Sequence, residues 1–315
     1  MKNKIIYSVL AIFVLLIIFS VIYNYKLNNT IKVVKQEVTI NNLPEEFEGF
    51  TILQITDLHS KIFGNNQEDL INLINKQKYD IIIFTGDMQN TEDNNYDIFL
   101  ELIEGIDNKD EVFYIAGNNG PFVFENEGMR FFYSSSKNLK LNDTGKVFKE
   151  LGIKLMDEVY EIKRGDSSLW ISELISNKEF YEKTNGGYKE GDIRLAITHY
   201  PMNESYYENN TKVNKETEAD ELINDEDSIP IYDLVLAGHY HGGQWRVPLM
   251  GAIFISDINE NGWFPSKERV SGLTAWGDYN QYVSRGLGAS GKYKFMRFRL
   301  FNEPEINLIT LNGDL

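Results

Sequence analysis

The 315-residue chain contains no cysteine. Disulfide bonds and thiolate metal sites are therefore excluded, and this absence is compatible with any redox compartment. Hydrophobic residues make up 42% of the chain and charged residues 25%, so the sequence is neither disordered nor of low complexity. A chain of this length can bury a sizeable core as one large domain.

Positive charge is also scarce. The 31 Lys and Arg residues are outnumbered by 47 Asp and Glu residues, which gives a net charge of -16. Nucleic acids and anionic membranes bind basic surfaces, so this balance argues against a general surface for either partner. An anionic substrate would need cations bound locally.

One long stretch near the N-terminus lacks charge altogether. Residues 5–23, IIYSVLAIFVLLIIFSVIY, are 19 residues without a charged side chain, and an α-helix needs about 20 apolar residues to cross a bilayer. We therefore predict a membrane anchor in residues 1–30, with a polar connector from Asn24 to Thr30. The alternative, a cleaved signal peptide, is disfavoured because no small-residue cleavage site follows the stretch.

The remainder, residues 31–315, is expected to form one domain at the cell membrane. Lysines flank the uncharged stretch on both sides, so the positive-inside rule does not settle the orientation. We expect the domain to lie on the extracytoplasmic side.

The domain repeats short apolar runs that end abruptly in polar residues. After VKQEVTI, which alternates like a strand, the runs are FTILQIT, DIIIFTG, VFYIAGN, IRLAITH and YDLVLAGH. QEDLINLINKQK and YDIFLELIEGI, between them, have helical spacing. Near-continuous apolar strands separated by helices indicate an α/β sandwich with buried strands. In such sheets ligands bind just beyond the carboxyl ends of the strands.

The polar residues that end these runs form one candidate site, and all four histidines of the chain are among them. The residues are Asp57, His59, Asp87, Asn118, His199, His239 and His241. An i, i+2 spacing, as in Asp57/His59 and His239/His241, aims two side chains to one side of an extended segment. Imidazole with carboxylate and amide oxygens is the ligand set expected for Zn, Mn or Fe. The alternative, four unrelated structural histidines, must explain why all of them lie at strand ends.

Five ordered motifs contain these residues: ITDLHS (55–60), TGDMQN (85–90), AGNNG (116–120), THYP (198–201) and AGHYHGGQ (237–244). With this set, the chain from about Val38 to its end resembles the calcineurin-like metallophosphoesterase family. VSRGLGASGKYKFMRFRLFNEPEI (283–306) is similar to the C-terminal signature of a membrane-associated or exported bacterial branch.

The resemblance implies a fold of two facing mixed β-sheets flanked by helices, with a dinuclear centre of two divalent transition-metal ions (Mn, Zn or Fe). Carried over by position, Asp57, His59 and His241 hold one ion, Asn118, His199 and His239 hold the other, and Asp87 bridges them. The implied activity is that of a hydrolase, in which a metal-activated hydroxide cleaves a phosphodiester, pyrophosphate or phosphomonoester bond. A phosphorylated small molecule or a lipid-linked, cell-envelope compound is the expected substrate, and no nucleic-acid partner is expected.

Asn119 departs from the family pattern, in which Gly-Asn is followed by a catalytic His and an acid. This chain has Asn119 and Gly120 there. Asn cannot deliver a proton at physiological pH, and general acid catalysis is typically worth ~10²–10⁴-fold. Three alternatives stay open: an enzyme whose substrate has a good leaving group or whose acid comes from elsewhere, a catalytically impaired metal- and phosphate-ligand-binding protein, and a scaffold that uses its acidic surface.

Several neighbours of these motifs are weaker candidates. Gly238, Gly242 and Gly243 permit tight turns or a close approach of the backbone. Thr56 and Gln244 can orient ligands, while Ser284 and Arg285 either contact a phosphate or make a structural ion pair. Residues 203–228, with nine acids against two lysines, form a solvated excursion or a lid, and the aromatics of 121–141 form core packing or an apolar wall for a lipid or aromatic leaving group.

Overall fold

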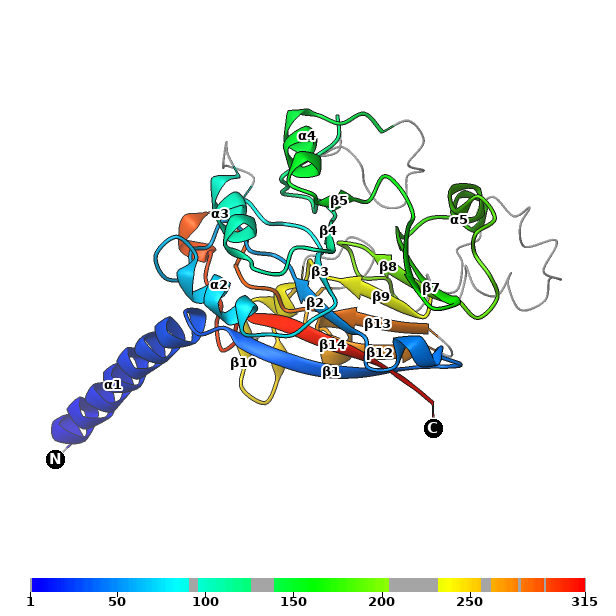
Figure 1. Cartoon of the computed structure of the whole chain (residues 1–315). Helices are drawn as coiled ribbons and strands as arrows, with labels where there is room; N and C mark the ends of the chain where they lie inside the picture. The colour runs from blue at the N-terminus through cyan, green and yellow to red at the C-terminus, as the bar shows by residue number, and fades with distance from the viewer. Residues whose placement is uncertain are drawn as a thin grey trace.

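A computed structural model describes residues 2–90, 96–125, 139–203, 232–255, 262–276, 279–291 and 293–314. Two six-stranded sheets form its centre (Figure 1). The first runs in the order β1 (Lys32–Ile40), β14 (Glu305–Gly313), β2 (Thr51–Ile55), β3 (Ile81–Phe84), β4 (Val112–Tyr114) and β5 (Lys154–Leu155). The second runs β12 (Gly272–Trp276), β13 (Tyr279–Val283), β9 (Leu234–Ala237), β8 (Ile193–Ile197), β7 (Ser167–Glu173) and β6 (Tyr160–Arg164).

Both sheets are mixed. β14 runs antiparallel to β2, while β2, β3, β4 and β5 are parallel to their neighbours. In the second sheet β7, β8, β9 and β13 are parallel, and β6 and β12 are antiparallel edge strands. A small hairpin of β10 (Arg246–Val247) and β11 (Gly251–Ala252) lies apart from them.

The two sheets face each other across a shared core, which explains the uninterrupted apolar runs. On β3, Ile81 and Ile83 pack against residues of the second sheet such as Leu195 and Leu236. The intervening Ile82 packs on the opposite face. Because successive side chains of a strand point to opposite faces, a strand covered on both sides must be apolar throughout.

Helices cover the outer faces of both sheets. α2 (Glu68–Asn75), α3 (Asp97–Gly105) and α4 (Asp143–Glu150) pack on the first sheet through residues such as Leu70, Phe99 and Phe148. α5 (Asn177–Thr184) packs on the second through Phe180 and Trp170. Short helical turns are η1 (Glu45–Phe47), η3 (His241–Gly243), α8 (Lys267–Val270) and η4 (Lys294–Met296). The predicted fold class and the helices expected in residues 67–78 and 96–106 are confirmed.

The N-terminal helix α1 (Lys2–Asn28) projects away from the sheets (Figure 1). An 18-residue window within residues 4–28 has a mean hydropathy of 3.1 and none of that window is buried in the protein, so α1 is long and apolar enough to cross a membrane. The sequence predicts a polar connector from Asn24 to Thr30, but α1 continues through Asn28.

The polar residues at the end of α1 are helical because they bind the domain. Asn24 Oδ1 accepts a hydrogen bond from Phe301 N at 2.7 Å. The Asn28 side chain accepts from Arg299 N at 2.8 Å and donates to Arg299 O at 2.7 Å. The predicted polar connector therefore includes a polar seam between the helix and residues 299–301.

Arg299 joins this seam to the centre of the domain. Its side chain is fully buried. The guanidinium donates to four backbone oxygens, those of Gly288 at 2.7 Å, Arg285 at 2.8 Å, and His241 and Asn302 at 3.1 Å each. One side chain thus holds together the loop at 285–302 and the loop that carries His241.

Replacing Arg299 should therefore destabilise the domain. Arg299→Met removes a donor from four carbonyls, of which His241 O keeps the Asn302 side chain as a donor. An unsatisfied buried acceptor costs about 1–3 kcal/mol, so we expect a loss of about 3 kcal/mol or more after partial relaxation. The check is a urea transition of the full chain in detergent, followed by near-UV circular dichroism. The control Lys146→Met, in an exposed pair with Asp143, should leave the midpoint unchanged. Equal midpoints for Arg299→Met and the unmodified chain would contradict the proposed role.

Candidate metal centre

The seven candidate residues lie at the carboxyl ends of five strands. Asp57 follows β2, Asp87 follows β3 and Asn118 follows β4, all in the first sheet. His199 follows β8 and His239 follows β9, which are parallel neighbours in the second sheet. Contacts across the sheets bring these ends together, among them Gln54 Nε2 to Ala237 O at 2.9 Å.

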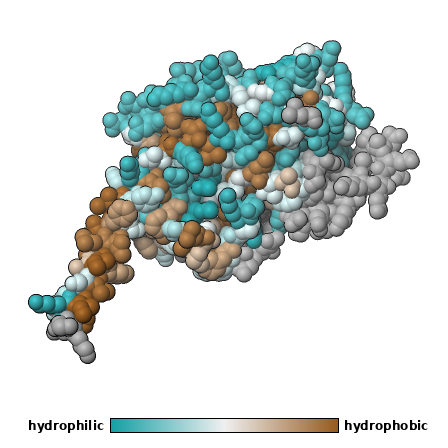
Figure 2. All heavy atoms as spheres, turned by 90° about the horizontal axis from the view of Figure 1, so that it is seen from below, coloured by the Kyte–Doolittle hydropathy of each residue, from teal (hydrophilic) through white to brown (hydrophobic). Residues whose placement is uncertain are grey.

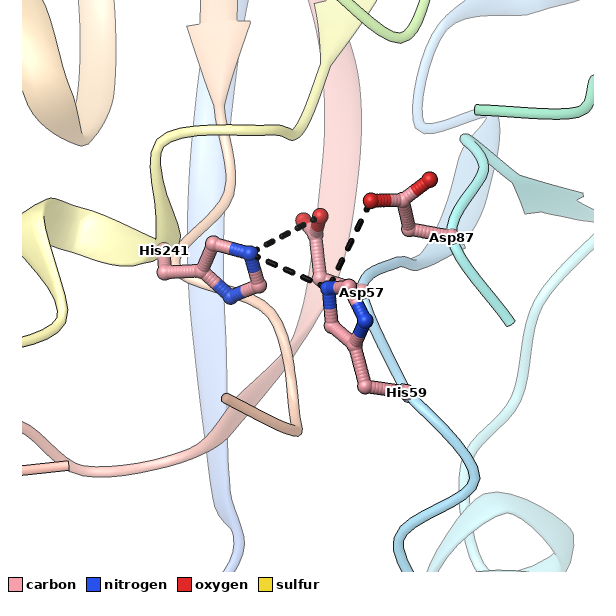
Figure 3. A group of neighbouring side chains, drawn as sticks. All are labelled: Asp57, His59, Asp87 and His241. Atoms are coloured by element: carbon pink, nitrogen blue, oxygen red, sulfur yellow. Dashed lines mark hydrogen bonds and ion pairs between the residues drawn. The ribbon is translucent and has the colours of Figure 1, made fainter. Parts of the chain in front are cut away.

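A first group consists of Asp57, His59, Asp87 and His241 (Figure 3). Their ligand-type atoms all lie within 4.8 Å of one another, and all four residues are buried. His59 Nε2 lies 3.1 Å from His241 Nε2 and 3.4 Å from Asp87 Oδ2, and His241 Nε2 lies 3.6 Å from Asp57 Oδ1. Imidazole nitrogens that face each other among carboxylate oxygens fit a bound divalent cation.

A second group surrounds the Nε2 atom of His199. Asn118 Oδ1 lies 3.1 Å from it, His239 Nδ1 lies 3.2 Å away, and Asp87 Oδ2 lies 3.5 Å away. The other ring nitrogen of His199 contacts Thr85 O at 2.9 Å, a partner of the kind that orients a metal-binding imidazole. Asp87 belongs to both groups.

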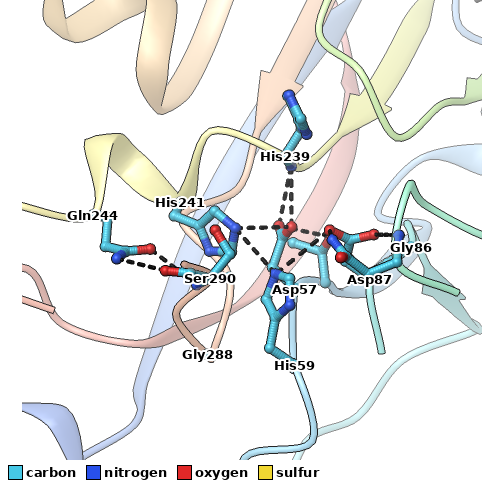
Figure 4. Close-up of polar contacts among 12 residues, drawn as sticks. Asp57, His59, Gly86, Asp87, His239, His241, Gln244, Gly288 and Ser290 are labelled. Carbon is cyan, nitrogen blue, oxygen red and sulfur yellow. Dashed lines mark hydrogen bonds and ion pairs between the residues drawn. The ribbon is translucent and has the colours of Figure 1, made fainter. Parts of the chain in front are cut away.

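The backbone at the site adopts a conformation that non-glycine residues rarely occupy. Asp57, His59, Asp87, His239 and His241 have φ between 48° and 70°. Left-handed non-glycine residues cost free energy, and they cluster at functional sites where surrounding contacts hold them. At this site, His239 N donates to the Asp57 carboxylate at 3.1 Å (Figure 4).

Burial dominates the electrostatics of the group. It raises the pKa of Asp57 to about 7 and lowers the pKa of His59 to about 4. Burial also disfavours charge on Asp87 and His199, but the attraction between these two outweighs it. The pKa of Asp87 is therefore lowered, and the pKa of His199 is raised to about 9. A metal-binding imidazole must be neutral, so a cation bound at His199 would compete with a proton there.

The weaker candidates have structural roles around the group. Thr56 Oγ1 donates to Asp57 Oδ2 at 3.0 Å. Gln244 bonds Ser290 in both directions, at 2.9 and 3.0 Å, and so joins the His241 loop to residues 290–296 (Figure 4). Arg285 pairs with Glu305 at 3.6 Å, which supports the structural alternative for this arginine.

Two glycine features shape the His239 and His241 loop. Gly242 and Gly243 have φ of 60° and 78°, as expected for a tight turn. Gly238 permits close approach instead, because a Cβ there would lie 2.2 Å from Thr56 Oγ1 and 2.6 Å from Asp57 Oδ2. The loop can therefore reach the first sheet.

Asn119 has a role that the sequence did not indicate. Its backbone N–H donates to Asp87 Oδ1 at 2.8 Å, and its side-chain Nδ2 donates to Asp87 Oδ2 at 2.6 Å. Both carboxylate oxygens of Asp87 are thus held by the residue at the position of the family's histidine. The contact depends on the side-chain direction, which no local motif reveals.

A cavity of about 710 Å³ opens over the group. His59, Asp87, Asn118 and Asn119 line one side, and Phe254, Trp263 and Met296 are among the residues of an apolar side. Of the two alternatives for residues 121–141, core packing holds for Phe124, which packs in the core with Val123, and 126–138 lie outside the described residues. The acidic excursion is also outside them from residue 204 onward.

Comparison with known proteins agrees with this geometry. The family model for calcineurin-like phosphoesterases matches residues 50–243. An uncharacterized metallophosphoesterase of Bacillus subtilis, YkuE, is 24% identical over 288 residues, covering 86% of this chain and 82% of the relative. The phosphodiesterase YaeI of Escherichia coli is 26% identical over 275 residues, covering 83% and 82%.

One solved structure, of a putative 5'-nucleotidase from Staphylococcus aureus, aligns with a TM-score of 0.42 at 13% identity. The alignment covers 85% of this chain and 55% of that one, and the likeness is too distant to support a conclusion. The match of the family model over more than half of the chain, on a buried group of Asp and His side chains able to hold metal, leads to one conclusion: the protein belongs to the calcineurin-like phosphoesterase family.

Proposed function

We propose that this phosphoester hydrolase uses two divalent transition-metal ions, Mn, Zn or Fe, to cleave a phosphodiester or pyrophosphate bond, with phosphomonoesters as poorer substrates. One ion would bind Asp57, His59 and His241, the other would bind Asn118, His199 and His239, and Asp87 would bind both. The position of Asp87 Oδ2 supports this most strongly, since it lies 3.4 Å from His59 Nε2 and 3.5 Å from His199 Nε2.

Bound there, such ions would supply an activated water and neutralise charge on the phosphoryl oxygens. The protein's own part is to hold the ligands in place. Asn119 fixes the Asp87 carboxylate through two hydrogen bonds, and Thr85 O orients His199. The apolar side of the cavity limits water around the reacting phosphate.

The lack of a histidine at position 119 favours substrates with good leaving groups. The Asn119 amide donates to Asp87 and has no proton to give a departing alkoxide. A diester with an acidic leaving group, or a pyrophosphate, needs little protonation. The name of the E. coli relative, a phosphodiesterase, supports the diester.

A second function has one observation in its favour. The same Asn119 would suit a protein that binds metal and a phosphorylated ligand without turnover, because its contacts stabilise the ligand set and assist no proton transfer. Metal binding is common to both functions, and only turnover separates them.

The first test is the metal content of the full chain. After equilibration with Mn²⁺ and gel filtration, we expect about two ions per chain, because each group offers three side chains plus a shared carboxylate. Asp87→Asn should lower the content to about one ion or fewer, since Asp87 belongs to both groups. Asp143→Asn, at an exposed carboxylate, should bind like the unmodified chain. A chain that retains no metal would contradict both functions.

The second test restores the missing histidine. Asn119→His should raise kcat/KM for a phenyl phosphodiester by about 10-fold or more, as general acid catalysis allows. It should give no gain in kcat/KM for bis-p-nitrophenyl phosphate, whose leaving group needs no proton, because the change also removes the hydrogen bond from Asn119 Nδ2 to Asp87. Asn119→Gln keeps an amide and should give no gain. Equal effects of Asn119→His on both substrates would contradict the leaving-group account, and no turnover of either by any variant would favour the binding protein.

We further propose that α1 crosses the cell membrane, with the domain on the extracytoplasmic side acting on a cell-envelope substrate. The similarity of residues 283–306 to a membrane-associated or exported branch of the family supports the extracytoplasmic side. Because the chain has no cysteine, Leu151→Cys on the exposed end of α4 gives a single label site. A membrane-impermeant maleimide should label it in intact cells. Labelling only after lysis would contradict the orientation.

A further inference from the structure

The membrane helix ends directly beside the metal group. A groove of about 540 Å³ lies between α1 and residues 289–300. Ser20 and Val21 line it from the helix, and His59 and Arg297 line it from the domain. His59 and Arg297 also line the larger cavity over the metal group, so the two spaces meet at these residues.

The groove lies at the level where α1 would leave the bilayer. Residues 5–23 carry no charge and, at 1.5 Å per residue, span roughly 28 Å, close to the hydrocarbon thickness of a bilayer. Ser20 and Val21 fall in the last turn of that stretch. Phe298, which lines the same groove, is therefore at the edge of the hydrocarbon layer. The ring of Tyr23 lies 6.1 Å from that of Phe301 and fixes the same level.

The domain also carries exposed apolar side chains near the end of α1 (Figure 2). We define the apolar rim as Leu249, Met250, Trp263, Phe264, Phe295 and Phe298, all of which are exposed. Figure 2 shows apolar side chains on the domain face beside the base of α1. Trp245, which directly precedes the hairpin that carries Leu249 and Met250, donates to Phe298 O at 2.9 Å, and the rings of Trp245 and Phe298 lie 5.4 Å apart. An exposed apolar area next to a membrane helix is typical of a membrane-contacting surface.

Charge supports the same surface. The chain as a whole carries -16, but residues 285–302 contain five Lys and Arg residues and no acid. Of these five, Arg299 is buried and Arg285 pairs with Glu305. Among them, Lys294 is exposed beside Phe295, and Arg297 lines both cavities. Aromatic and basic side chains together are typical of segments that lie among anionic lipid headgroups.

We propose that the apolar rim lies in the headgroup layer of the membrane that α1 crosses, and that the groove beside α1 admits the phosphorylated headgroup of a membrane lipid to the metal group. The hydrocarbon tail of this lipid stays in the bilayer. The substrate class in this proposal rests on the proposed phosphoesterase function, whereas the seating of the rim does not.

Whether the apolar rim lies in the headgroup layer can be measured without an enzymatic assay. Phe295→Cys, in a chain without other cysteines, would carry a nitroxide label in the full protein in phosphatidylglycerol nanodiscs. The matched control is Leu151→Cys, at an apolar exposed residue of the distant α4 end. The ratio of oxygen to nickel-chelate accessibility should be about fivefold or more higher at 295, because apolar oxygen concentrates in the bilayer. Equal ratios would overturn the seating, and a label shielded from both reagents would mean that a protein surface covers the rim.

The substrate class is tested with two diesters that share one leaving group. Phe295→Glu combined with Leu249→Glu should lower turnover of a dioleoylglycerol p-nitrophenyl phosphodiester in nanodiscs by about tenfold or more, since charge disfavours insertion. Turnover of soluble bis-p-nitrophenyl phosphate should be unchanged, and Leu151→Glu should affect neither. Equal loss on both substrates, or no loss on the lipid, would overturn the lipid substrate. If the unmodified chain turns over neither, the proposed function fails while the label still decides the seating.

Discussion

The architecture depends on two carboxylates that are buried beside each other. Asp57 and Asp87 are 0% and 1% exposed, and an ionised carboxylate removed from water costs several kcal/mol unless it is paired. Asp87 is compensated by His199 and by two hydrogen bonds from Asn119, and its pKa stays low. Asp57 accepts hydrogen bonds from Thr56 and from His239 N, but the effect of burial is larger and raises its pKa to about 7. A cation bound beside Asp57 would favour its ionised carboxylate, since a bound metal ion is often the largest local charge in a site.

That the seven candidate residues lie close together was predictable because each follows a strand end, where chain order and sheet topology suffice. Asp57 and His59 follow an uninterrupted apolar run, and parallel strands present their carboxyl ends together. The role of Asn119 was not predictable, because it depends on the direction of one side chain. The left-handed φ values of Asp57 and His241 were equally hidden, since neither residue is a glycine.

Long-range contacts explain the other misses. Asn28 and Arg299 are 271 positions apart in sequence, so a local pattern of polar residues indicated a polar connector where the structure has a packed seam. The overall charge of -16 was similarly uninformative about residues 285–302, where no acid occurs. In the first case a local sequence pattern differs from the contacts in the fold. In the second case the net charge of the whole chain differs from the charge of one segment. Arg299 connects these features, since it bonds the His241 loop and sits beside the end of α1.

The central claim is that two metal ions share Asp87. Electron paramagnetic resonance of the Mn²⁺-loaded full chain tests it most directly. Two Mn²⁺ ions about 3.5–4 Å apart couple through a bridging carboxylate, so the account predicts a multiline spectrum of an exchange-coupled pair that disappears in Asp87→Asn. A simple six-line spectrum of isolated Mn²⁺, unchanged by Asp87→Asn, would contradict it.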